Sequence, residues 1–232
     1  MTDEPQSYWP EQITIDNPPA KKALVLLSGG MDSVCALHAS IFVYGRGNVD
    51  ALSIDYGQAH RQELEAARVI AEANGVRQTT LMGGQAVKGV WPLKVPAPGL
   101  DGAGVSKANT PGRNAVLLSI AAAFAAKRWP WGDAAIVVGA NADDAKAFPD
   151  CRPAFFQAMG EVLRHALAGV ARVRIDTPWI GMSKAQVAVW AATRPEAWRD
   201  AMRSVSCYEG TDCGTCDACT LRHAALATVM SP

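Results

Sequence analysis

The sequence predicts an α/β fold, a doubly wound, Rossmann-like parallel β-sheet with helices on both faces. Two observations predict it. Short apolar runs alternate with helix-length stretches along the chain, and small or polar residues directly follow several of the apolar runs. Strands that alternate with helices at this spacing form a parallel sheet covered on both faces. Ligands of such sheets bind beyond the carboxyl ends of the strands, so the residues that follow the strands are the first candidates for a site.

The expected strands span residues 23–27, 50–55, 78–81, 134–139 and 170–175. The expected helices span residues 34–44, 62–74, 114–127, 153–168, 183–192 and 221–229. Gly75 is placed to end the second helix, and Ser183 to cap the fifth. We expect residues 140–150 to form a loop. Residues 82–110 are rich in glycine and proline, and an irregular stretch of this length usually has a function.

Three segments are expected. Residues 1–20 contain four prolines and should form an extended N-terminal arm. Residues 21–200 carry the pattern of strands and helices and should form the main domain. Residues 201–232 contain a cysteine cluster followed by the last expected helix.

Charge and hydropathy exclude two classes of partner. Lysine plus arginine equals aspartate plus glutamate, 22 against 22, so no net field attracts nucleic acid or an acidic membrane. The first twenty residues lack the apolar core of a signal peptide, and the apolar run at 120–126 is too short to cross a bilayer. We therefore expect a cytoplasmic protein with no direct nucleic-acid partner and no membrane partner.

The loop SGGMDS at residues 28–33 has the chemistry of a phosphate site. Its glycines let the backbone approach an anion, the start of the next helix supplies unpaired N–H groups, and its serines add hydroxyls. Asp32 would repel phosphate unless a cation such as Mg²⁺ lay between them. An ordinary glycine-rich turn is the alternative. The expected nucleotide contacts are Leu27, Ser28, Gly29, Gly30, Met31, Asp32, Ser33 and Val34.

This loop lacks the Walker sequence and the three-glycine dinucleotide fingerprint. It resembles instead the SGGxDS loop of the ATP pyrophosphatases, which cleave ATP to AMP and pyrophosphate. The resemblance implies ATP as substrate and residues 21–200 as a PP-loop ATP pyrophosphatase domain.

Four of the six cysteines lie within thirteen residues near the end of the chain. Their spacing suits a tetrahedral Zn²⁺ site, and an iron–sulfur cluster is the competing interpretation. Four cysteine ligands leave no open position for a substrate, so the metal should be structural. The expected ligands are Cys207, Cys213, Cys216 and Cys219.

From about Lys22 to Ala225 the chain resembles the 7-cyano-7-deazaguanine synthases. The motifs that carry this resemblance, beyond the loop and the cysteines, are SIDYGQAHRQELEAAR at 53–68, PGRNAVLLSIAAAFA at 111–125, FPDCRPAFF at 148–156 and TPWIGMSKAQV at 177–187. The resemblance implies an adenine-nucleotide α-hydrolase-like fold, a homodimer, and a place in queuosine biosynthesis. It implies that ATP adenylates the carboxylate of 7-carboxy-7-deazaguanine, that ammonia then forms an amide, and that a second ATP converts the amide to a nitrile.

Catalytic roles then fall on Asp32, Lys184 and Arg113. Asp32 would hold Mg²⁺, and Lys184 in the Gly-x-Ser-Lys element would meet departing pyrophosphate. Arg113 offers a planar fork for phosphate or carboxylate. The alternatives are a first-turn lysine and a helix-surface arginine with no catalytic role.

Substrate contacts are expected from five residues. Asp150 and Arg152, in the Pro-Asp-Cys-Arg element, suit the edge of a deazaguanine, because a carboxylate accepts from its N–H groups. Tyr56 and Gln58 follow the second expected strand and would serve recognition, or merely form a turn. Phe148 belongs to the same expected pocket. Cys151 is a candidate nucleophile, although adenylation already activates the carboxylate.

The sequence departs from the family before Pro-Asp-Cys-Arg, where it reads Asp144-Ala-Lys-Ala-Phe148 in place of Asp-Tyr-Ser-Gly-Tyr. Tryptophans at 179, 190 and 198 are also unusual and either pack or form a partner surface. Two alternatives therefore stay open. One is an enzyme that stops at the amide or joins the carboxylate to another amine, such as that of a protein. The other is a non-catalytic nucleotide sensor or interaction subunit.

Overall fold

A computed structural model describes residues 20–56, 61–82, 112–207 and 212–230. These residues form one five-stranded sheet in the order β3-β2-β1-β4-β5, and every pairing in it is parallel. The strands are β1 (Lys22–Leu26), β2 (Val49–Asp55), β3 (Arg77–Met82), β4 (Asp133–Val137) and β5 (Arg172–Asp176). All five expected strands are therefore confirmed, with ends displaced by one or two residues.

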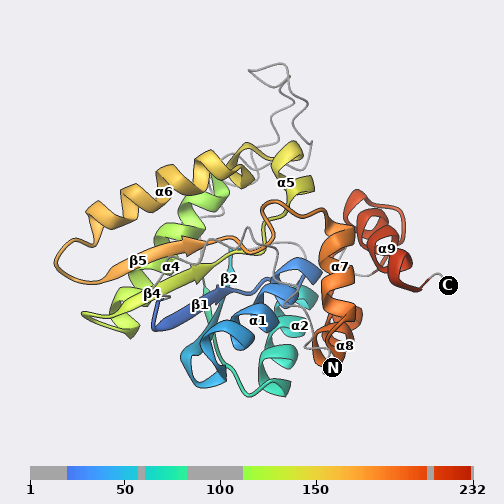
Figure 1. Cartoon of the computed structure of the whole chain (residues 1–232), viewed down its shortest axis with the longest axis horizontal. Coiled ribbons are helices and arrows are strands. Elements are labelled where there is room, and N and C mark those ends of the chain that lie inside the picture. The colour runs from blue at the N-terminus through green and yellow to red at the C-terminus, as the bar shows by residue number, and fades with distance from the viewer. Residues whose placement is uncertain (1–19, 57–60, 83–111, 208–211, 231–232) are drawn as a thin grey trace, which may run out of the picture.

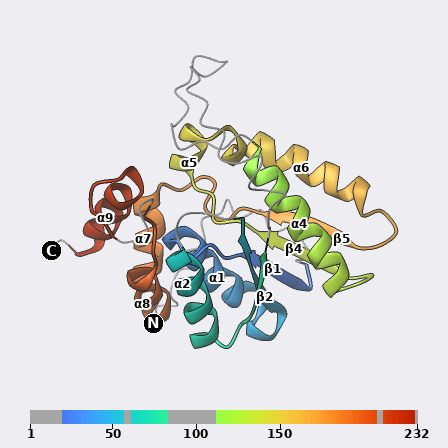
Figure 2. The ribbon, with the colours of Figure 1, turned by 180° about the vertical axis from the view of Figure 1, so that it is seen from behind.

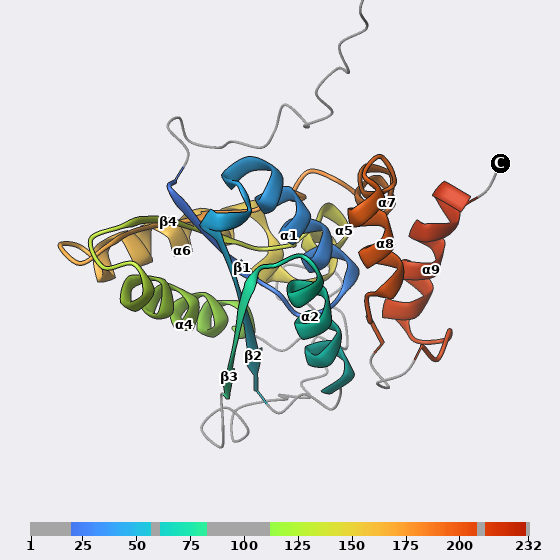
Figure 3. The ribbon, with the colours of Figure 1, turned by 90° about the horizontal axis from the view of Figure 1, so that it is seen from below.

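Helices cover both faces of this sheet (Figure 1). They are α1 (Met31–Tyr44), α2 (Arg61–Ala73), α4 (Arg113–Arg128), α5 (Ala142–Ala147), α6 (Pro153–Ala166), α7 (Lys184–Ala192), α8 (Pro195–Arg203) and α9 (Asp217–Met230), with short 3₁₀ turns η1 (Arg46–Asn48) and η2 (Pro149–Cys151). Figure 2 shows α4 and α6 together on one face. Figure 3 shows α1 and α2 on the other face, with α7, α8 and α9 outside α1. None of the described helices is long and apolar enough to cross a membrane.

Alternation along β1 divides the interior into two cores. Ala23 and Val25 pack with α1, α2 and α7, whereas Leu24 packs with α4 and α6. Successive side chains of a strand point to opposite faces, so a central strand with both faces covered is apolar throughout. This arrangement fixes the carboxyl end of β1, and the loop that follows it, at the centre of the sheet edge.

Two expectations about local structure were wrong. Residues 140–150 are not a loop, because α5 and η2 lie within them. Asn141 starts α5 by accepting hydrogen bonds from the backbone N–H groups of Asp143 and Asp144 at 2.9 and 3.0 Å. The helix α8 was not expected at all. It begins with Pro195 at its first turn, where a missing N–H costs nothing.

Other local expectations are confirmed. Ser183 caps α7 through a bond that its hydroxyl accepts from the N–H of Gln186. Trp179 and Trp190 are buried against each other with ring centroids 4.8 Å apart, so they pack inside the protein. The N-terminal residues 1–19, Gln58 and residues 83–110 of the expected irregular stretch lie outside the described residues.

A buried polar cluster joins α8 to α1 and α2. The carboxylate of Asp200 accepts from His38 Nε2 at 3.0 Å, Asn74 Nδ2 at 2.7 Å and Arg199 Nε at 2.8 Å. Burial alone would raise the pKa of Asp200, but the bonds from His38, Arg199 and Asn74 outweigh it and hold this pKa below its usual value.

Replacing Asp200→Ala leaves His38 and Asn74 without their buried acceptor. We expect the free energy of unfolding to fall by about 3–5 kcal/mol. Urea unfolding measures it, with Glu196→Ala on the exposed side of the same helix as the control. A loss below about 1 kcal/mol would show that the cluster does not hold α8 in place.

Candidate functional site

A pocket of about 290 Å³ opens at the carboxyl ends of β1, β2 and β4. Its walls come from the loop after β1, the end of β2, the first turns of α2 and α4, and the residues after β4. The chain leaves β1 and β4 towards opposite faces of the sheet, which is where doubly wound sheets bind ligands. Of the nine expected nucleotide contacts, the eight at 27–34 and Lys184, the pocket lining includes Leu27, Ser28, Gly30, Asp32 and Ser33.

Close backbone approaches shape the loop after β1. Gly29 has φ +95°, and a Cβ there would lie 2.0 Å from the carbonyl oxygen of Glu63. A Cβ on Gly139 would lie 2.7 Å from the backbone of Asp32. Only glycine fits either position, because a side chain would collide with backbone. The side chains of Met31 and Val34 are buried in the core, so only their backbone is available to a ligand.

The serines of the loop bond to the loop itself. Ser33 Oγ donates to the carbonyl oxygen of Gly30 at 2.9 Å and accepts from the N–H of Ser28 at 3.2 Å. Ser28 Oγ accepts from the N–H of Gly30 at 3.3 Å. The hydroxyls therefore hold the loop in shape before any ligand arrives.

Asp32 and Lys184 form a largely buried ion pair beside the pocket, with side chains 16% and 12% exposed. Trp179 Nε1 donates to the backbone oxygen of Asp32 at 3.1 Å. Burial alone would lower the pKa of Lys184, but the charges of Asp32 and Asp144 outweigh it and raise this pKa. Among the described residues, Asp32 Oδ1 is buried without a hydrogen-bond partner, and a cation is one ligand that would satisfy it.

The sequence did not single out the carboxylates of α5 as partners of Lys184. Asp143 Oδ2 accepts from the backbone N–H of Lys184 at 2.9 Å. Burial, reinforced by the charge of Asp32, raises the pKa of Asp144 to about 6. An N-cap asparagine followed three residues later by an acidic residue was the available signal for a helix here.

Arg113 lines the pocket together with Tyr56 and Glu63. Burial raises the pKa of Tyr56, and Arg113 offsets part of this. Burial also raises the pKa of Glu63 to about 7, again against the effect of Arg113. Glu63 lies inside a motif that we quoted for the family but was not singled out, because nothing in a helical sequence shows which glutamate faces a pocket.

The expected substrate residues of η2 and its neighbours are not part of the described pocket wall. Asp150 Oδ2 accepts from the N–H of Asn114 at 3.0 Å and so caps α4. Arg152 Nε donates to the carbonyl oxygen of Ala145 at 3.3 Å, and Phe148 is partly buried against the core that includes residues of α4 and α6. Cys151 does line the pocket, 3.3 Å from Asn114 Nδ2. Burial, with Asp144 and Asp150, raises the pKa of this thiol to about 12.

A second site lies at the four clustered cysteines. Their sulfurs all lie within 4.8 Å of one another, and Cys213 Sγ is 3.9 Å from Cys219 Sγ. Cys213 Sγ accepts from the N–H of Cys216 at 3.4 Å, a contact of the kind that stabilises thiolates. Zn–S bonds of about 2.3 Å place tetrahedral sulfurs about 3.8 Å apart, so this donor set fits a metal ion. Cys207, Cys213, Cys216 and Cys219 are thus brought together as expected.

The environment of Glu63 predicts a pH dependence of stability. The folded protein keeps the Glu63 proton up to about pH 7, whereas an unfolded glutamate releases it near pH 4.5. Stability should therefore fall as pH rises through this window. We expect Glu63→Gln to remove that fall and to raise the free energy of unfolding by roughly 2 kcal/mol over the original protein above pH 7.

Urea midpoints from pH 4 to pH 8 measure this stability, with Glu72→Gln on the exposed face of α2 as the control. Parallel pH curves for the protein and the Glu63→Gln variant would contradict the assignment.

Comparisons with known proteins identify the family of this chain. The family model described as queuosine biosynthesis protein QueC matches residues 22–230. A 7-cyano-7-deazaguanine synthase from Chromobacterium violaceum is 38% identical over 91% of this chain and 92% of its own length. One from Aromatoleum aromaticum is 40% identical over 88% of this chain and 92% of its own length. Among solved structures, NMN synthetase from Francisella tularensis is 16% identical with a TM-score of 0.47, covering 76% of this chain and 63% of that one. The chain belongs to the QueC family.

Proposed function

We propose that the protein is an ATP-dependent synthase of queuosine biosynthesis that converts 7-carboxy-7-deazaguanine and ammonia to 7-cyano-7-deazaguanine. The observation that carries this proposal is the pocket at the carboxyl ends of β1 and β4. Residues of the SGGMDS loop line this pocket, and the Asp32–Lys184 pair lies beside it. Membership of the QueC family selects the substrate class.

The proposed reaction replaces a poor leaving group by a good one. The substrate carboxylate attacks the α-phosphorus of ATP, which releases pyrophosphate and forms an acyl adenylate. Ammonia displaces AMP, loses a proton and leaves the amide. The amide oxygen attacks a second ATP with release of another pyrophosphate, and departure of AMP with loss of the remaining N–H protons yields the nitrile. The protein contributes to this chemistry by aligning the reacting groups and by neutralising phosphate charge.

Four groups would align the substrate and neutralise phosphate charge. The N–H groups of the first turn of α1 that follow Met31 would hold phosphate oxygens, because the first helical N–H groups lack partners within the helix. The raised pKa of Lys184 keeps it an ammonium at neutral pH, the form that stabilises departing pyrophosphate. Arg113 lies on the pocket wall as a second cation. Asp32 would hold Mg²⁺, which neutralises phosphate charge when bound, and the unpartnered Oδ1 fits that role.

Recognition of the deazaguanine by Tyr56, Gln58, Phe148, Asp150 and Arg152 remains part of the proposal. Asp150 Oδ2 already accepts from Asn114, so Asp150 would read the base edge with its other oxygen. For the cysteine cluster we propose Zn²⁺ in a structural role, because four sulfur ligands leave no position for substrate.

The first test is mass spectrometry of the products formed from 7-carboxy-7-deazaguanine, ATP, Mg²⁺ and ammonium. We expect the nitrile with AMP and pyrophosphate, and a loss of at least about 100-fold in kcat for Lys184→Ala. Lys127→Ala on the exposed face of α4 is the matched control. Amide as the final product would identify an enzyme that stops after the first adenylation. Absence of AMP with this substrate would overturn the proposal.

A second test concerns Cys151. A thiol with a pKa of about 12 stays protonated at neutral pH and is a weak nucleophile. We therefore expect Cys151→Ala to keep kcat within about threefold, and intact mass spectrometry during turnover to detect no thioester. A mass increase that matches the acyl group and disappears in Cys151→Ala would instead establish covalent catalysis.

A further inference from the structure

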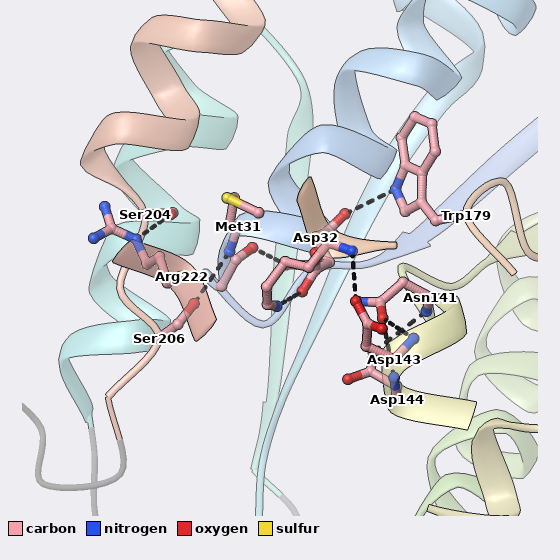
Figure 4. A network of polar contacts seen from close by, with 12 residues as sticks. Met31, Asp32, Asn141, Asp143, Asp144, Trp179, Ser204, Ser206 and Arg222 are labelled. Atoms are coloured by element: carbon pink, nitrogen blue, oxygen red, sulfur yellow. Dashed lines mark hydrogen bonds and ion pairs between the residues drawn. The ribbon is translucent and has the colours of Figure 1, made fainter. Parts of the chain in front are cut away.

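Residues 204–207 follow α8 and end at Cys207, the first residue of the cysteine cluster. They lie against the SGGMDS loop at residues 28–33, which we call the phosphate loop. Val205 donates its N–H to the carbonyl oxygen of Gly29 at 3.0 Å. Ser206 Oγ accepts from the N–H of Met31 at 3.3 Å (Figure 4). A Cβ on Gly30 would lie only 3.1 Å from the same oxygen. Two consecutive residues thus bond to Gly29 and Met31 of the loop and lie close to Gly30 between them, and the Met31–Ser206 bond joins positions 175 residues apart. We call residues 204–207 the strap.

The chemistry of the Met31–Ser206 bond differs from that of an ordinary surface contact. Met31 is the first residue of α1, and its N–H is one of the donors that a helix cannot satisfy internally. A hydroxyl that accepts from this N–H keeps its own proton for donation. Ser206 therefore replaces the Met31 N–H by its own hydroxyl as the available donor and holds the backbone of the loop in place.

Both ends of the strap are anchored. At one end, Arg222 of α9 is buried and donates from Nη2 to the carbonyl oxygen of Met202 at 2.9 Å and from Nε to Ser204 Oγ at 3.4 Å. At the other end, Cys207 belongs to the cysteine cluster, and Cys219 Sγ lies 3.9 Å from the carbonyl oxygen of Ser206. A metal ion bound by these cysteines would join the strap to α9 by bonds that the bare thiols do not make.

We propose that the strap couples the cysteine metal site to the phosphate loop, with Ser206 as a positioning residue for the nucleotide. Metal occupancy then sets nucleotide affinity, and nucleotide sets metal affinity by the same factor, because coupling between two binding sites is reciprocal. The nucleotide arm of this inference rests on the proposed function, whereas the contact between strap and loop does not.

The experiment compares the full chain with Zn²⁺ bound and after removal of the metal by a chelator. Hydrogen exchange of the amides at 28–34 reports the loop directly and needs no nucleotide. We expect exchange there to become at least about fivefold faster without metal, while the amides of α6 stay unchanged. Faster exchange across the whole chain would mean global unfolding, and unchanged exchange at 28–34 would overturn the coupling.

Titration of ATP and Mg²⁺ by calorimetry forms the second arm. We expect metal removal to weaken binding about tenfold, and ATP to slow Zn²⁺ release to a colorimetric chelator. If the Zn²⁺-bound protein binds no ATP, the proposed function and the nucleotide arm fail together, and hydrogen exchange still decides the strap. If ATP binds equally well with and without metal, the regulatory part is wrong.

Variants separate Ser206 from general damage. We expect Ser206→Ala to weaken ATP binding about fivefold and speed exchange at Met31, with the Zn²⁺ content unchanged. Ser206→Thr keeps the hydroxyl and should restore most of both. Ser119→Ala removes a hydroxyl of α4 that donates only to a backbone oxygen of its own helix, and serves as the control. Equal ATP affinity and equal exchange in Ser206→Ala and Ser119→Ala would remove Ser206 from the proposal.

Discussion

The carboxylate of Asp32 is the group on which the arrangement of the site depends. It stands in the first turn of α1, where the positive end of the helix favours a negative charge, but burial penalises that charge unless a partner is near. Lys184 supplies the partner from α7, and the N–H of Lys184 is itself held by Asp143 of α5. One buried charge therefore fixes the relative positions of three helices that are far apart in sequence. Asp32 Oδ1 has no hydrogen-bond partner among the described residues, as expected of a carboxylate oxygen that binds a cation.

Topology brings these helices together. The order β3-β2-β1-β4-β5 puts β1 at the centre, so the loop after it meets elements from both halves of the chain. Gly139, after β4, allows the backbone there to approach the backbone of Asp32, because any side chain at position 139 would collide with it. The contacts from Val205 and Ser206 add a third source, the segment before the cysteines. The phosphate loop is thus held by its own serines, by α2, by the β4 end and by the strap.

Sequence predicted the periodic features and missed those that depend on contacts at a distance. The strands β1, β2 and β4 were predictable because each contains a short apolar run, and the cysteines because their spacing alone defines a ligand set. The helix α8 was not predicted because its buried face includes the polar residue Asp200. The partners of Asp200, His38 and Asn74, lie far away in the chain. Glu63 was missed for the same kind of reason, since its place on the pocket wall and not its residue type distinguishes it from the other glutamates of α2. Asp150 was assigned to substrate alone, whereas the structure gives it a bond to the first turn of α4.

The sequence departs from the family pattern at Asp144-Ala-Lys-Ala-Phe148, and the positions of these residues bear on whether the enzyme stops at the amide. Lys146, the added charge, is 77% exposed and pairs with Asp143 on the outside of α5, while Phe148 is partly buried against the core. None of residues 144–148 belongs to the described wall of the pocket. What this stretch contributes to the site is Asp144, which it shares with the family pattern and whose charge helps to keep Lys184 an ammonium. The changed residues therefore act on the solvent side and in the core, so the surroundings of the Asp32–Lys184 pair give no reason to prefer an enzyme that omits an adenylation step.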